Sequence, residues 1–118
     1  MSSPAFQFVS PEIMSKLANL KPYTLAVLTK GENYGFSDTP RIIQSEHLPY
    51  VFQQRSDNQM VLTMPIKDND SNLAAIAIYN TTDKEEVKRL LDKDPAIMAG
   101  VFDYEIVTGI GFPGDKLP

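Results

Sequence analysis

The sequence predicts an α+β domain with the split βαβ, or ferredoxin-like, arrangement: a four-stranded antiparallel sheet with two helices on one face. Two observations predict this class. The expected elements follow the order β-α-β-β-α-β after one extra N-terminal helix, and two of the strands are apolar on both faces, as in the interior of a packed sheet. With 118 residues the chain is long enough for one domain with a real core. We expect an N-terminal extension (1–22), the α+β domain (23–108) and a C-terminal tail (109–118).

The extension is expected to hold a short helix at about residues 11–19. Ser10 offers a capping hydroxyl, and Pro11 suits the first helical position because its missing N–H would be unpaired there. The first strand, residues 23–29, carries apolar side chains toward both faces.

The first long helical segment starts after Ser37 or Asp38, either of which can cap it. Apolar residues recur at roughly helical spacing as far as Phe52. Pro49 lies inside this segment, and a proline there should kink or break the helix.

The remaining elements are separated by polar turns. Two further strands are expected at residues 59–64 and 73–79, with a surface loop at 67–72 between them. A capping-box pattern opens the second helix, about 83–92, and the fourth strand occupies 101–107.

A tightly constrained turn connects the second helix to the fourth strand. Asp94 can cap it, Pro95 suits its first position, and Gly100 can take the positive φ that ends it. The simplest interpretation of Asp94 is a helix cap. The alternative is a carboxylate held firmly at the mouth of a strand for chemistry.

The second face of the predicted sheet needs a cover. Strands 23–29 and 73–79 are apolar on both sides, although the two helices can cover only one side. A solvated face would alternate apolar and polar residues. We therefore expect a homodimer packed sheet to sheet, with the N-terminal helix as the alternative cover.

The composition excludes several classes of protein. The net charge is −4 and no basic patch is present, which argues against a nucleic-acid partner. The chain has no cysteine, so disulfides and thiolate sites are excluded, and its single histidine among scattered acids predicts no metal site. With no signal peptide and no membrane-length apolar run, we expect a soluble cytoplasmic protein.

His47 is the only imidazole of the chain, and imidazole is the side chain that exchanges protons near neutral pH. A lone histidine in a helix is most simply an exposed or hydrogen-bonded residue. Its place in the sequence favours a second interpretation.

The segment His47-Leu48-x-Tyr50, followed by Asp94-Pro95-Ala96-Ile97-Met98-Ala99-Gly100-Val101-Phe102, resembles the YCII-related family of the dimeric α+β barrel superfamily. The resemblance spans roughly residues 23–108 and includes the first and third strands. The second segment is its specific part.

The resemblance implies that His47 and Asp94 form a catalytic pair, and Arg41 is a loose match to a basic residue upstream of the histidine. Relatives include muconolactone isomerase-like enzymes and a dehydrochlorinase that acts on a hydroxylated aromatic. Proton transfer on a small organic molecule without an obligatory cofactor is therefore implied. Where the family commonly has Ala-Gly-Pro, this chain has Thr63-Met64-Pro65, so Met64 is expected to reshape or narrow the pocket.

Our hypothesis gives His47 the role of general acid or base and Asp94 that of orienting it. Arg41 and Tyr34 are candidates for holding an anionic or phenolic substrate. The leading function is thus a small cofactor-independent lyase, isomerase or hydrolase. The alternatives are a non-catalytic ligand-binding or accessory module on the same fold, and an oxygenase of the same superfamily, with or without haem.

Overall fold

The computed structural model of the chain describes residues 10–118. Its contacts divide the chain into a unit of residues 23–109 and a second unit made of the terminal segments. The terminal unit contains the helix α1 (Pro11–Leu17), where the sequence predicted residues 11–19. The Ser10 hydroxyl accepts the N–H of Ile13 at 3.3 Å, which is the contact expected of a cap.

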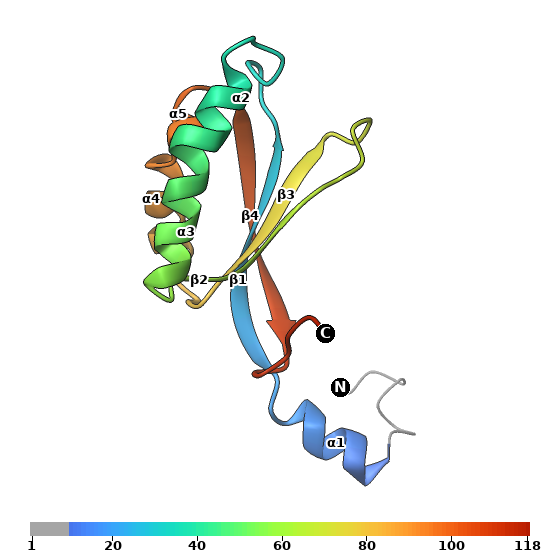
Figure 1. Cartoon of the computed structure of the whole chain (residues 1–118). Helices are drawn as coiled ribbons and strands as arrows, with labels where there is room; N and C mark the ends of the chain where they lie inside the picture. Colours follow the sequence, from blue (N-terminus) through green and yellow to red (C-terminus); the bar gives the residue numbers. More distant parts are fainter. Residues whose placement is uncertain (1–9) are drawn as a thin grey trace. The chain divides into compact units, whose positions relative to one another are not determined.

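The sheet has the predicted ferredoxin-like topology. Its strands lie in the order β2-β3-β1-β4, and β3 pairs antiparallel with both β1 and β2 (Figure 1). The α+β fold class is therefore confirmed. The strands are β1 (Lys21–Lys30), β2 (Met60–Pro65), β3 (Leu73–Tyr79) and β4 (Phe102–Gly111).

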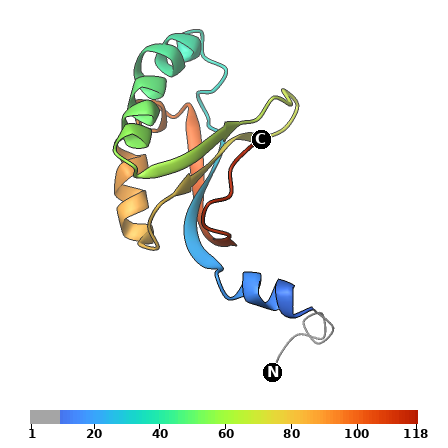
Figure 2. The same cartoon turned by 60° about the horizontal axis from the view of Figure 1, so that its bottom comes forward.

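The helices of this unit lie together on one face of the sheet, as Figures 1 and 2 show from two directions. The first helical region runs without a loop through α2 (Thr39–Ile42), η2 (Ile43–His47) and α3 (Leu48–Ser56). The second consists of α4 (Lys84–Asp92) and the single turn α5 (Pro95–Met98). None of the helices within residues 10–118 is long and apolar enough to cross a membrane.

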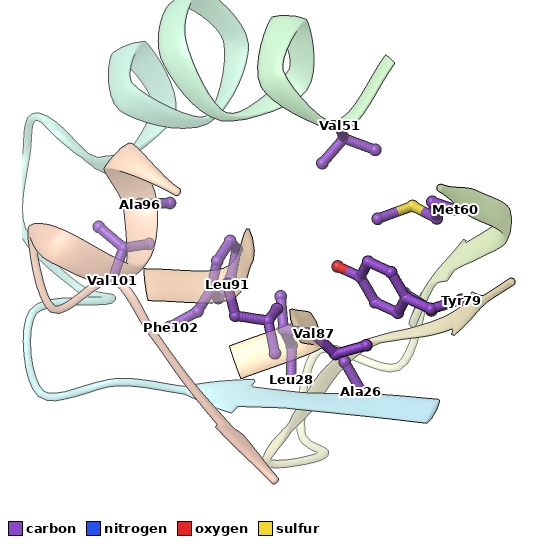
Figure 3. Close-up of a cluster of buried hydrophobic side chains, with 11 residues drawn as sticks. Ala26, Leu28, Val51, Met60, Tyr79, Val87, Leu91, Ala96, Val101 and Phe102 are labelled. Atoms are coloured by element: carbon purple, nitrogen blue, oxygen red, sulfur yellow. The ribbon is translucent and has the colours of Figure 1, made fainter. Parts of the chain in front are cut away.

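The core fills the space between the sheet and these helices (Figure 3). Ala26 and Leu28 of β1 point toward the helices, and the Tyr79 ring of β3 lies among them with its hydroxyl directed into the cluster. The helical side contributes Val51, Val87, Leu91 and Ala96, and the cluster is completed by Met60, Ala77, Val101 and Phe102.

Strand β4 runs further than predicted, because residues 109–111 of the expected tail belong to it. Gly109 suggested a flexible segment in the sequence. In the structure, a Cβ on Gly109 would lie 2.7 Å from Cδ1 of Leu25, so this glycine permits close packing within the sheet.

The helix does not break at Pro49. Instead, the turn Ile43–His47 widens to a π-helix, in which the N–H of Leu48 donates to the carbonyl of Ile43. Proline has no N–H, and its ring would clash with the carbonyl four residues back in a regular α-helix. We attribute the widened turn to this conflict, and π-turns of this kind are frequent at functional sites.

Candidate active site

The chain's only histidine pairs with Asp94. Nδ1 of His47 lies 2.7 Å from Oδ2 of Asp94, although the two residues are 47 positions apart in the sequence. Both are buried, with 9% of His47 and 3% of Asp94 exposed. At this distance the contact is a charge-assisted hydrogen bond, and little water is present to weaken it.

Each oxygen of the Asp94 carboxylate has its own partner. Oδ1 accepts the N–H of Ala96 at 2.9 Å, which caps the turn α5, and Oδ2 accepts from His47. Pro95 occupies the first helical position of α5. The cap and the histidine contact are therefore compatible, because the cap fixes the direction in which the second oxygen points.

This contact determines which nitrogen of His47 carries the proton. An ionised carboxylate can only accept hydrogen bonds, so Nδ1 must be the donor. Nε2 has no hydrogen-bond partner in the part of the chain that the structure describes. In the neutral ring, Nε2 therefore keeps a free lone pair that can accept a proton.

The His47 ring continues a row of aromatic side chains. It packs edge-on against Phe102 of β4, with the ring centroids 5.2 Å apart and the planes at 60°. Phe102 in turn contacts Tyr34 at 6.0 Å. Phe102, adjacent to the resemblance motif's glycine, thus connects the histidine to the loop before α2.

A pocket of about 430 Å³ opens beside this row. His47, Tyr34 and Phe102 line it, together with apolar side chains of η2, α3 and β3. Such a volume falls within the range of about 300–1,000 Å³ that is usual for small-molecule sites. Its charged lining residues are Lys30, Arg55 and Asp68.

A second, much smaller cavity of about 20 Å³ lies next to the His47–Asp94 pair, with Tyr50, Gln54 and Tyr79 in its lining. Burial, the neighbouring Tyr50 and the charge of Asp94 together raise the pKa of Tyr79 far above its usual value. Burial and Asp94 also raise the pKa of Tyr50, whose hydroxyl donates to the Leu90 carbonyl at 2.6 Å. Both phenols therefore stay neutral beside the pair.

The structure brings Tyr34 into the pocket with His47, but it places Arg41 elsewhere. The Arg41 guanidinium is exposed and pairs with Asp38 at 2.7 Å and Glu46 at 2.8 Å. Asp38, a predicted helix cap, therefore makes no side-chain capping bond.

Met64 does not line the pocket either. It lies opposite Ile76 on the other face of the sheet and is 41% exposed, whereas its neighbours Thr63 and Pro65 line the pocket. An irregularity between Met60 and Leu62 shifts the alternation of β2. Met60 therefore faces the core, and the next residues pointing inward are Thr63 and Pro65.

Sequence reasoning missed Lys30 and Arg55, which were assigned to a loop and a polar turn. They are 25 positions apart by residue number, and only the folded chain brings them to one pocket. No group of three or more metal-ligating side chains gathers anywhere in residues 10–118.

No protein-family model and no curated protein matches this sequence. Among solved structures, the chain is similar to 5-chloro-2-hydroxyhydroquinone dehydrochlorinase (TftG) from Burkholderia phenoliruptrix, determined in complex with 2,5-dihydroxybenzoquinone. The identity is 18% and the TM-score 0.50, over 73% of this chain and 90% of that one. It is also similar to protein Atu4242 from Agrobacterium tumefaciens, with 12% identity and a TM-score of 0.41 over 80% and 94% of the two chains. The likeness to TftG shows a shared α+β fold.

Proposed function

We propose that this chain is a small enzyme in which His47 and Asp94 carry out acid/base chemistry on a small organic molecule bound in the 430 Å³ pocket. One observation carries the proposal: the only histidine is held by a buried carboxylate at 2.7 Å, and the same residue lines a pocket of ligand size. A positioned imidazole whose orientation is fixed by a third group is the usual form of a general base.

The proposed step begins with neutral His47. Nε2 accepts a proton from the bound substrate, and the ring becomes an imidazolium next to the Asp94 carboxylate, which stabilises the new positive charge. Return of this proton to another substrate atom gives an isomerisation. Its delivery to a leaving group gives an elimination, and its abstraction from water gives a hydrolysis. A positioned base of this kind contributes on the order of 10²–10⁴-fold to such a step.

Two likenesses support the enzyme class. The chain shares its fold with a protein named as a dehydrochlorinase and solved with a quinone. The His47 and Asp94 segments also resemble the YCII-related family, to which we propose that residues 23–108 belong.

The test has a structural and a functional part. In ¹⁵N–¹H spectra of wild-type protein, the neutral His47 ring is expected to carry its proton on Nδ1. Asp94→Asn is expected to change the tautomer and to abolish turnover in a screen of small phenols and lactones, as is His47→Gln. Arg89→Gln, an exposed change on α4 outside the pocket lining, is the matched control and should leave turnover unchanged.

A wild-type ring protonated on Nε2 would contradict the proposed role of Asp94. Tight binding of a ligand that no variant or condition converts would favour the second candidate, a non-catalytic binding module. The ligand-sized apolar pocket favours that candidate too, since it needs no chemistry at His47.

We further propose that the chain forms a homodimer through the outer face of its sheet. Directly opposed residues share a face, and Leu25, Val27, Ile76 and Ile78 form an apolar, half-buried patch on the side away from the helices. Ile76→Lys is expected to convert a dimer to a monomer in light scattering. A monomeric wild type would contradict this assignment. The absence of cysteine is in keeping with a reducing compartment, and we propose a cytoplasmic location.

A further inference from the structure

The pocket beside His47 differs in charge from the chain around it. The protein as a whole carries a net charge of −4. The charged residues that line the pocket are two cations, Lys30 and Arg55, and one carboxylate, Asp68, which together give +1. A pocket with an excess of positive charge attracts anions, most strongly where apolar walls limit access of water.

Lys30 is held in place without losing its charge. It ends β1, its ammonium donates to the backbone carbonyl of Asn69, and it lies 5.3 Å from the centroid of the Tyr34 ring. Neither partner is a carboxylate. An ammonium has three donors, so it can bind a further acceptor in the pocket.

Arg55 lies in the last turn of α3 and has no ion-pair or hydrogen-bond partner for its guanidinium within residues 10–118. Arg41, in the same helical region, has two carboxylate partners. A planar guanidinium can bind a carboxylate through two parallel hydrogen bonds. Lys30 and Arg55 are therefore available to one ligand anion, with Asp68 opposing them.

The wall between these cations and the histidine is aromatic and fixed. The loop that carries Tyr34 is tied to the start of β4 by the N–H of Gly31, which donates to the Val101 carbonyl at 2.8 Å. Asn33 adds a backbone bond to Gly100 at 2.9 Å and a side-chain bond to Ala99 at 2.8 Å. Tyr34 is thus held at its contact with Phe102, and flat rings favour flat ligands.

We propose that the pocket takes a flat, unsaturated organic anion, such as an aromatic carboxylate or phenolate. Lys30 and Arg55 bind its charged group, and Tyr34 and Phe102 pack against its ring. This assignment deepens the proposed function, because it places the anion's reacting atom beside His47. Removing a proton from an already anionic ligand increases its negative charge, and two nearby cations stabilise that charge.

The test compares ligands of equal shape and different charge. Calorimetric titrations use benzoate, salicylate and cinnamate, each beside its neutral amide. We expect each anion to bind more tightly than its amide. Lys30→Gln and Arg55→Gln should each weaken anion binding about threefold to tenfold and leave amide binding unchanged. Asp68→Asn should strengthen anion binding, Arg89→Gln is the control without effect, and circular dichroism checks that each variant is folded.

Failure of this assignment is distinguishable from failure of the enzyme proposal. Equal binding of anions and amides, no binding of any probe, or anion binding insensitive to both cation variants would overturn the assignment. His47→Gln should retain charge-dependent binding of the three anions. If that binding is found and no substrate is ever turned over, the anion site stands and the acid/base function of His47 is wrong.

Discussion

Two ionic contacts lie at the two ends of the same helical region, and their geometry is nearly identical. The His47–Asp94 contact measures 2.7 Å, and Arg41 contacts Asp38 and Glu46 at 2.7 and 2.8 Å. Their surroundings differ. The Asp94 side chain is 4% exposed, whereas the Arg41 side chain is 56% exposed. Distance therefore says little here about energy, because water screens the second contact and barely reaches the first.

The largest effect is expected at Asp94. Asp94→Ala leaves the Ala96 N–H and a ring nitrogen of His47 without partners inside the protein, so we expect a loss of about 3 kcal/mol in the free energy of unfolding. Asp94→Asn keeps an oxygen for Ala96 and should lose roughly half as much. Urea unfolding measures both. Equal losses in the two variants would mean that the cap adds nothing to the buried contact.

The second prediction concerns pH. The pKa of Tyr79 is raised in the folded protein, chiefly by burial, so above pH ~10 the unfolded chain releases a proton that the folded chain keeps. Stability is therefore complete below the ordinary tyrosine pKa and falls as pH rises above it, by up to about 1.4 kcal/mol per pH unit for this group. Tyr79→Phe should flatten the fall between pH 10 and 11 in urea unfolding. An unchanged slope would mean that another tyrosine causes it.

A smaller effect is expected at Gln54, which is buried but differs from Asp94 in having an unpaired oxygen. Its Oε1 has no hydrogen-bond partner within the described chain, and its Nε2 lies 3.5 Å from the Tyr50 carbonyl. Gln54→Met has a similar shape and no such atom to satisfy, so thermal unfolding should show a gain of about 1 kcal/mol. A loss of stability would show that the amide is satisfied in solution, by a water in the small cavity beside it.

The smallest effect is expected at Arg41. Because its partners are exposed, Arg41→Gln should leave the thermal midpoint near that of the wild type, and any difference should vanish in high salt. The Arg41 guanidinium lowers the pKa of Asp38, so whatever stabilisation the pair provides is present above pH ~3.8 and lost as pH falls through the lower folded value. The two unfolding curves should therefore converge in acid. A large salt-independent difference would contradict the comparison.

The sequence predicted most of the fold, because its order of elements and its turn residues agree with one topology. It also predicted that Asp94 caps a turn, since the pattern Asp-Pro before a glycine is local. The spacing of Asp38 and Arg41 contained a further signal, because residues three apart on a helix are neighbours. That signal predicts the surface pair that removes Arg41 from consideration as a pocket cation.

Other features depend on tertiary structure and could not be predicted locally. The bulge after Met60 changes which β2 side chains face inward, and regular alternation would have placed Met60 and Met64 on one face. Lys30 and Arg55 come from different elements, and their proximity to one pocket is a property of the packed sheet and helix. Pro49 suggested an interruption, whereas the chain accommodates it within a continuous helical path.

The π-turn of Ile43–His47 has a consequence for inheritance. Such a turn contains one residue more than an α-helix would need, so deleting a single residue between positions 43 and 46 would restore regular winding. Everything on one side of the deletion would then rotate by about 100° relative to the other side, which is the angle of one residue in a helix. The histidine would keep its identity and lose its aspartate. In descendants of this chain, a gap of one codon in this helix would therefore separate the pair as completely as a substitution at His47.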